Sequence, residues 1–301
     1  MKSPLRDLFD FERPDTPGER LFFWLFELFV VLTLSWHAWK WAVYLGRIAA
    51  PLYPSGLARY LDVSLLMHPG TALGLAAVVT LLLLLGLTRR WPPAYLLALL
   101  GLHLLYVSRF SLGKTPHGSH LLGLTLLSLA LGALLFQRPF YRRRTALGFT
   151  YFFVGLSYTL AACSKLVATG PGWADGTHLA LWILEKGVDV TARAGSWEPT
   201  PWQQLLLMHP TLSTVLLTGV LLLELLAFTV WWRPFRQPIL LGLICMHIGI
   251  YVTLQISFHF AVLELLLLAL PWSQWFDVLL RKHQMAQIFR PLVRLAHWRM
   301  A

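Results

Sequence analysis

The feature that most constrains this chain is a series of apolar runs, most of them long enough to cross the hydrocarbon core of a lipid bilayer. An α-helix rises about 1.5 Å per residue, so about 20 apolar residues span a core of about 30 Å. The runs lie at residues 21–43, 71–87, 94–110, 120–136, 147–164, 212–232, 239–255 and 258–270. We therefore predict an all-α fold, a polytopic transmembrane helical bundle of about eight spans.

The composition agrees with this class. Apolar residues make up 57% of the chain and charged residues only 13%, as in integral membrane proteins. A net charge of +11 would suggest nucleic-acid binding in a soluble domain. Here, however, the basic residues lie in short segments between the apolar runs, where topology explains them. We expect membrane lipid as a partner and no nucleic acid.

The distribution of Lys and Arg predicts the orientation, because these residues favour the cytoplasmic side of short loops. With eight spans, both terminal segments lie on the same side of the membrane. These segments and the loops on that side contain 17 of the 25 Lys and Arg residues. Seven lie in the longer segments on the other side, and Lys40 lies near the outer end of the first span. We expect both termini to be cytoplasmic. High Leu, Ala and Arg usage favours a bacterial plasma membrane.

The runs divide the chain into three parts. We expect a cytoplasmic N-terminal segment (1–20), a transmembrane domain (21–271) with two long outer loops (45–70 and 167–210), and a basic amphipathic C-terminal segment on anionic lipid (272–301). Within the second loop, the spacing of Thr177–Val188 fits a helix at the membrane surface. Met-His-Pro occurs at 67–69 and again at 208–210. Proline at a helix start is sufficient to explain both copies.

Lys165 directly follows the run 147–164, at the depth where hydrocarbon gives way to the interface. Two interpretations remain open. A snorkelling anchor, with its stem in lipid and its ammonium in water, is the one that position alone favours. A lysine turned toward the bundle interior would instead be desolvated, which frees an amine able to act as base or nucleophile.

Several other ionisable side chains lie inside the runs, where such groups are costly and often functional. They are Glu27, His37, His103, His120, Glu224, His247, His259 and Glu264. The topology places Lys165, His120 and His259 at the outer ends of their spans, where we expect them to converge with His247. We expect Glu224 and Glu264 to pair with a histidine or to orient it. Bonds between helices are the simpler explanation for any one histidine. No HExxH or CxxC pattern is present, so no metal is predicted.

At these residues the chain resembles a known family. Lys165 lies in Ser164-Lys165-Leu166, after Tyr151-Phe152-Phe153 and Gly155 and before Trp173 and Gly176. His120 is the first residue of the run His120-Leu121-Leu122-Gly123-Leu124. His247 lies in Cys245-Met246-His247-Ile248, and Glu224 lies in the apolar run before that one. In this order the patches resemble the transmembrane part of vitamin K-dependent gamma-carboxylases and the related horizontally transferred transmembrane (HTTM) domain proteins of bacteria. Ser164 stands where that family has a second lysine, and the spacer from Lys165 to Trp173 is longer.

The resemblance implies an activity. Its catalytic residues would be Lys165 as the base, His120 as the residue that assists it, and Glu224 and His247. The cofactor would be a reduced naphthoquinone of the vitamin K or menaquinone type, oxidised in an outer-facing pocket. We expect Trp173, Gly176, His259 and Glu264 to bind the substrate. The chain ends soon after its last apolar run, without the large lumenal region of the carboxylases, so a protein substrate or redox partner would come from another chain.

Two other functions remain open at this point. One is a non-enzymatic scaffold that binds a quinone or lipid and serves a redox partner. The other is a transporter, for which inverted repeats and broken paired helices are expected. Only the repeated Met-His-Pro points toward a transporter.

Overall fold

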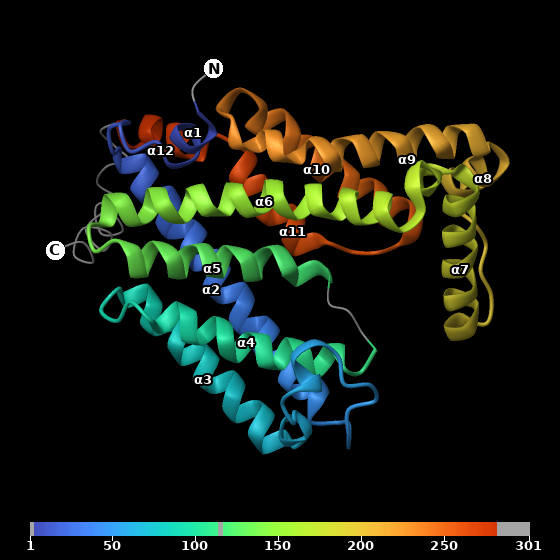
Figure 1. Ribbon diagram of the computed structural model, residues 1–301, viewed down its shortest axis with the longest axis horizontal. Helices are drawn as coiled ribbons and strands as arrows, with labels where there is room; N and C mark the ends of the chain where they lie inside the picture. Colours follow the sequence, from blue (N-terminus) through green and yellow to red (C-terminus); the bar gives the residue numbers. More distant parts are fainter. Residues whose placement is uncertain (1–2, 114–116, 282–301) are drawn as a thin grey trace. The chain divides into compact units, whose positions relative to one another are not determined.

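The computed structural model describes residues 3–113 and 117–281. Every regular element in this part of the chain is a helix, which confirms the all-α class (Figure 1). The chain forms two compact units: unit 1 comprises Met1–Asp7 and Tyr151–Leu270, and unit 2 comprises Leu8–Thr150 and Pro271–Ala301. The boundary between them falls inside helix α6 (Pro139–Thr169). Each unit is described by itself below.

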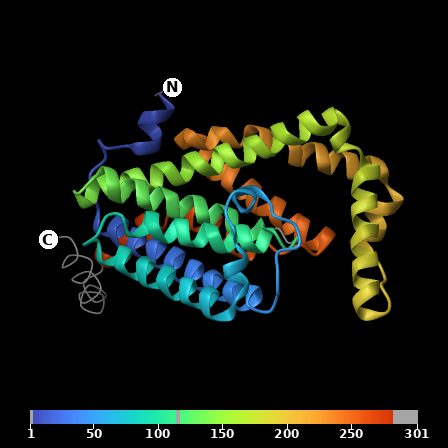
Figure 2. The same ribbon diagram turned by 60° about the horizontal axis from the view of Figure 1, so that its bottom comes forward.

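Unit 2 is a bundle of four main helices, α2 (Pro17–Leu45), α3 (Pro69–Thr88), α4 (Ala94–Phe110) and α5 (His120–Leu135). Each packs against the next along the chain, and α2 also contacts α4 and α5, as Figure 2 shows. Shorter elements join or flank them: η1 (Gly56–Arg59), η2 (Ser64–Met67), η3 (His117–Ser119) and α12 (Trp272–Arg281). A further boundary between the units falls inside α1 (Pro4–Phe9). The core between the helices is apolar and closely packed, with side chains such as Phe26, Leu34 and Leu105 almost completely buried.

Unit 1 contains the C-terminal part of α6 and seven further elements. These are η4 (Gly170–Ala174), α7 (Gly176–Ala194), α8 (Pro201–Met208), α9 (Pro210–Leu225), η5 (Leu226–Trp231), α10 (Arg233–Leu254) and α11 (His259–Ala269). Helix α7 runs across the direction of α9 and α10 in both views (Figures 1 and 2). Its buried side packs on α8 and α9 through a small apolar core that includes Leu179, Ile183 and Leu206.

All eight apolar runs coincide with helices. Five helical segments are long and apolar enough to cross a membrane: α2, α3, α6 with η4, α9 with η5, and α10. They become six if α11 and α12, which a short break separates, form one span. Helices α4 and α5 are apolar but shorter, with 17 and 16 residues. The chain therefore has the structure of a multi-pass membrane protein, and the count of eight spans stays a prediction.

Some helix boundaries differ from the apolar runs. Residues 142–144, three consecutive arginines expected in an inner loop, belong to the first turns of α6, because arginine is a good helix former. The same helix continues past Lys165 to Thr169, and Gly170, with φ of +65°, follows its last residue. Thr177–Val188 lies inside α7 as expected. Of the predicted amphipathic C-terminal segment, the part up to Arg281 lies in α12, and the rest is outside the described residues.

The proline in each Met-His-Pro begins a helix. Pro69 is the first residue of α3 and Pro210 the first of α9, and in each case the preceding histidine is the N-cap residue. A proline at this position loses no hydrogen bond, since the first amide groups of a helix have no partner within it. The structure therefore confirms the simpler explanation of the repeated tripeptide.

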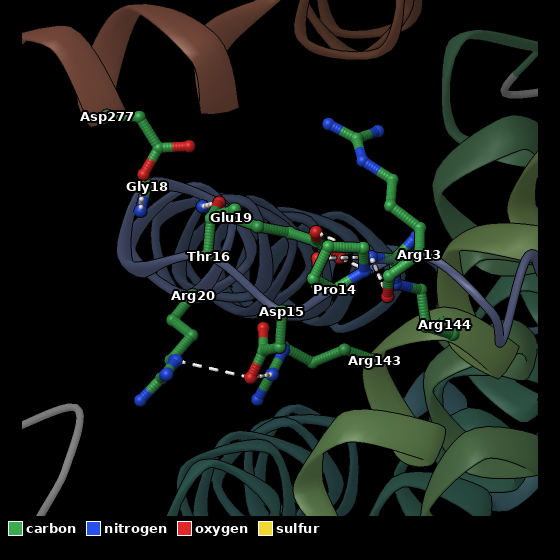
Figure 3. A network of polar contacts seen from close by, with 10 residues as sticks. All are labelled: Arg13, Pro14, Asp15, Thr16, Gly18, Glu19, Arg20, Arg143, Arg144 and Asp277. Atoms are coloured by element: carbon green, nitrogen blue, oxygen red, sulfur yellow. Dashed lines mark hydrogen bonds and ion pairs between the residues drawn. The ribbon is translucent and has the colours of Figure 1, made fainter.

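Arginines and carboxylates form a network at the N-terminal end of α2 in unit 2 (Figure 3). The Asp15 carboxylate accepts a hydrogen bond from Arg143 at 2.6 Å and lies 3.2 Å from the Arg20 guanidinium. Arg144 donates to Glu19 at 2.8 Å. The backbone N–H of Gly18 donates to Asp277 of α12 at 2.8 Å, which ties α12 to α2. In the sequence these arginines indicated only topology. In the structure their bonds to carboxylates also stabilise unit 2.

Glu27 is the most deeply buried carboxylate of this region, with an exposed fraction of 0%. It accepts hydrogen bonds from Arg89 at 2.9 Å and from the Tyr95 hydroxyl at 2.8 Å, and Arg142 lies 3.6 Å away. A buried carboxylate with two cations and a hydroxyl is well compensated. Its place inside the first apolar run therefore has a structural explanation.

Candidate functional site

Lys165 and Glu224 form an ion pair in unit 1. Lys165 lies near the C-terminal end of α6, and its Nζ donates a hydrogen bond to the carboxylate of Glu224 on α9. The Lys165 side chain is 25% exposed and that of Glu224 7%. A snorkelling anchor would hold its ammonium in water, so this burial favours the second interpretation, a lysine turned into the helix bundle. The sequence had paired Glu224 with a histidine instead, and that expectation is wrong.

An aromatic ring covers the same ammonium group. The Nζ of Lys165 lies 4.4 Å from the centre of the Trp173 ring, a distance typical of a cation–π interaction. Trp173 belongs to η4, the short helix that follows α6, and its ring also contacts Trp182 of α7 at 5.6 Å. The turn after Lys165 thus folds back over the lysine. The structure brings together Lys165, Glu224 and Trp173, three of the residues predicted from the sequence.

The helix that carries Glu224 changes its winding just after this residue. Helix α9 ends at Leu225, and the chain continues as the 3₁₀ helix η5. Thr159 of α6 bridges the break, because its hydroxyl accepts from the N–H of Phe228 at 3.0 Å and lies 3.4 Å from the carbonyl of Glu224. A 3₁₀ stretch within an apolar helical segment often marks a functional position. Here it adjoins the carboxylate that pairs with Lys165.

Tyr158 and His247 form a second polar pair in unit 1. The Tyr158 hydroxyl on α6 lies 2.6 Å from Nε2 of His247 on α10, and the Phe258 ring packs 4.7 Å from the imidazole. His247 is 7% exposed, and its Nδ1 is buried with no hydrogen-bond partner among the described residues. An imidazole bonded on one side only retains a second position for a proton or a ligand.

The two pairs share one helix. Tyr158 and Lys165 are seven residues apart, two turns of α6, so their side chains leave the same side of the helix about 10 Å apart along its axis. Tyr158 was not among the residues predicted from the sequence, because its bond to His247 depends on how α10 packs against α6.

The other residues predicted to bind substrate lie elsewhere in unit 1. His259 is exposed at the start of α11, where its Nδ1 lies 2.8 Å from the Ser257 hydroxyl. Glu264 is completely buried on the same helix. Gly176 begins α7, and a Cβ there would lie 2.0 Å from the carbonyl oxygen of Pro210. Gly176 thus allows α7 and α9 to approach closely, and its role in binding stays a prediction.

Asp175 caps the helix that Gly176 begins. Its carboxylate accepts from the backbone N–H of Thr177 at 3.0 Å and from the hydroxyl of the same residue at 2.7 Å. These two hydrogen bonds lower the pKa of Asp175 below its ordinary value. A charged carboxylate at this end of α7 is also favoured by the helix dipole.

His120 lies in unit 2, whereas Lys165 lies in unit 1. It is the first residue of α5, and its Nε2 lies 2.6 Å from the hydroxyl of Tyr106 on α4. The Tyr106 ring is flanked by His103, Trp41 and Phe110, with ring centres 6.0 to 6.2 Å away. The described residues of each unit thus include a tyrosine hydroxyl hydrogen-bonded to a histidine ring nitrogen. The convergence of His120 with Lys165 stays a prediction.

The described part of the chain contains no group of three or more His, Cys, Asp or Glu side chains arranged to hold a metal ion. The acid–base groups described above in unit 1 include the Lys165 amine, the Glu224 carboxylate, the Tyr158 phenol and the His247 imidazole. No protein-family model, curated protein or solved structure matches this chain.

Proposed function

We propose that this protein is a multi-pass membrane enzyme that oxidises a reduced, lipid-soluble quinone at an acid–base site in unit 1. The proposal rests above all on one observation, the Lys165–Glu224 ion pair beneath Trp173. Ionisable pairs among membrane helices are rare and tend to mark sites of proton transfer. The resemblance of the residues around Lys165 to carboxylase-like HTTM proteins supports a hydroquinone as the substrate.

The ion pair can supply an uncharged base. In a water-poor site, transfer of the proton from the Lys165 ammonium to Glu224 removes two opposite charges that are costly to bury. The product is a neutral amine beside a carboxylic acid. That amine can accept a proton from a phenolic hydroxyl, and the ring of Trp173 holds its cationic form in place once it has done so.

Tyr158 and His247 supply a second proton acceptor two helical turns away. The imidazole takes part in a hydrogen bond with Tyr158 through Nε2 and keeps Nδ1 for a proton or a ligand oxygen. A hydroquinone carries two hydroxyl groups on opposite sides of its ring. We assign one to Lys165 and the other to His247, with Phe258 and Trp173 as apolar walls.

The overall reaction needs only the hydroquinone and molecular oxygen. Together they give the quinone epoxide and one water, which balances atoms and electrons. The residues of the chain accept protons, orient the substrate and exclude water. We place the site on the outer side of a bacterial plasma membrane with both termini in the cytoplasm, as the bias of Lys and Arg predicts.

The test is oxygen-dependent epoxide formation from a reduced naphthoquinone by the purified protein in lipid. We expect turnover by the wild type and its loss in Lys165→Ala. Lys186→Ala is the matched control, because Lys186 also forms an ion pair, with Asp189 at 2.9 Å, but lies on the exposed side of α7. Equal turnover in all three proteins would contradict the role of Lys165.

A non-enzymatic scaffold is the second candidate, and one observation favours it. Lys165 is already neutralised by Glu224, as expected of a polar bond that only joins two helices. On this reading the protein binds a quinone or lipid for a redox partner. Absence of turnover in the wild type, together with co-purification of a stable partner protein, would support the scaffold and reject the enzyme.

A further inference from the structure

Arg109 is a buried cation without a carboxylate partner in unit 2. It lies in the last turn of α4 and is only 8% exposed. Its guanidinium forms no ion pair or hydrogen bond among the described residues, and the centre of the Tyr44 ring lies 5.2 Å from its Cζ. Arginine almost never stays buried without a partner, because desolvating its charge is costly.

The other buried arginines of unit 2 show the contrast. Arg142, Arg143 and Arg144 are similarly buried, and each lies within 4 Å of a carboxylate. For Arg109 only the C-terminal dipole of α4 and the Tyr44 ring offset the charge. Its Nε is enclosed by protein, while the two terminal nitrogens are neither bonded nor enclosed. The open end of the guanidinium is the part that binds an oxyanion through two parallel hydrogen bonds.

The neighbouring chain segment indicates where such an anion would come from. Tyr53 and Ser55 donate backbone hydrogen bonds to Ser111, which directly follows the end of α4, at 2.9 and 3.3 Å. The segment that they begin exposes six large apolar or aromatic side chains: Leu52, Tyr53, Leu57, Tyr60, Leu61 and Leu65. Exposed apolar side chains at the end of an apolar helix are typical of a chain immersed in the membrane interface. Lipid phosphates lie at this depth.

The local charge also fits an anion. Segment 46–68 carries Arg47 and Arg59 and a single acidic residue, Asp62. The Asp62 carboxylate already accepts the backbone N–H of Ser64 at 2.9 Å. Arg47 and Arg59 are exposed and can attract an anion, whereas Arg109 alone is positioned to hold it in a desolvated place.

We propose that Arg109, with Tyr44 beside it, binds the phosphate of a phospholipid headgroup whose acyl chains lie along the exposed apolar side chains of segment 52–65. This site is independent of the quinone site proposed in unit 1. The phosphate accepts two hydrogen bonds from the guanidinium and supplies the charge that the protein lacks there. A bound lipid thus becomes part of the folded structure of unit 2.

The experiment uses the full chain, purified and delipidated in detergent, with binding followed by native mass spectrometry and by the shift in melting temperature. The probe is short-chain phosphatidylglycerol, compared with diacylglycerol of the same chains and with inorganic phosphate. We expect saturable binding of phosphatidylglycerol that raises the melting temperature. Arg109→Gln should weaken it about tenfold or more, Arg109→Lys less, and the exposed control Arg47→Gln less than about threefold.

Four results would overturn the proposal. Equal affinity of wild type and Arg109→Gln would remove Arg109 from the site, and equal losses in Arg109→Gln and Arg47→Gln would reduce the effect to surface charge. Stabilisation by diacylglycerol alone would show that the acyl chains suffice. Stabilisation by inorganic phosphate equal to that by the lipid would assign the site to a free oxyanion. Arg109→Gln removes an unpaired buried charge, so we expect it to melt no lower than the lipid-free wild type.

Discussion

The ammonium group of Lys165 bonds the carboxylate of Glu224, and both groups are largely removed from solvent. Breaking one side of such a pair leaves the other as a buried, unpaired charge. Lys165→Met should therefore lower the free energy of unfolding by about 2–3 kcal/mol. Combining it with Glu224→Met should restore most of that loss. Thermal unfolding in detergent of the wild type, the two single variants and the double variant would test this prediction. Additive losses in the double variant would show that the two residues do not interact.

The bond between Tyr158 and His247 makes a separate prediction. Tyr158→Phe keeps the ring but removes the hydroxyl that hydrogen-bonds the imidazole of His247, which should cost about 1 kcal/mol of stability. If unit 1 handles protons as proposed, hydroquinone turnover should fall about tenfold to a hundredfold, with a change in its pH profile. The matched control is Tyr251→Phe, since Tyr251 is exposed on the same helix as His247. Equal turnover in both variants would exclude Tyr158 from the chemistry.

The sequence was sufficient for the helices but not for the partners of their polar side chains. Apolar runs identify helices because a membrane helix needs a minimum length of continuous apolar sequence. The partner of Glu224 is set by how α9 rotates against α6, and no local pattern contains that rotation. Lys165 and Trp173 were found because they are near in sequence. Tyr158 was missed because a tyrosine in an apolar helix is unremarkable until the neighbouring helix is placed.

Gly176 allows a close approach of two helices, and this can be tested. A Cβ at Gly176 would lie 2.0 Å from the Pro210 carbonyl oxygen, so the start of α7 must move away from α9. Gly176→Ala should lower the free energy of unfolding by about 1–3 kcal/mol. Gly219→Ala on α9 is the control, because a Cβ there meets nothing within 4 Å and alanine is the better helix former. A shift in melting temperature of the same size in both variants would contradict this packing role.

The carboxylate of Asp175 makes the start of α7 sensitive to acid. Because hydrogen bonds from Thr177 lower the folded-state pKa, Asp175 stabilises the helix fully above the pKa of an unfolded aspartate, about 3.9. This contribution is lost as the pH falls from there through the lower folded-state pKa. We expect hydrogen-exchange protection of the first turn of α7 to decrease over that range in the wild type. In Asp175→Ala the hydrogen-exchange protection of this turn should be lower than in the wild type at neutral pH, and it should change little on acidification.

Unit 2 should depend most strongly on Glu27. This carboxylate is completely buried and bonded to Arg89 and Tyr95, with Arg142 close by. Glu27→Gln removes the charge that offsets two buried guanidinium groups, so we expect a loss of about 3 kcal/mol or more in the free energy of unfolding.

Arg90→Gln is the matched control for Glu27→Gln, because Arg90 is the exposed neighbour of Arg89 and its side chain makes no contact that Glu27 shares. Its melting temperature should stay close to that of the wild type, within the small range typical of surface substitutions. Similar losses in the two variants would contradict a specific role of Glu27. A large loss confined to Glu27→Gln would show that Arg89 and Arg142 stabilise unit 2 by direct bonds to this carboxylate.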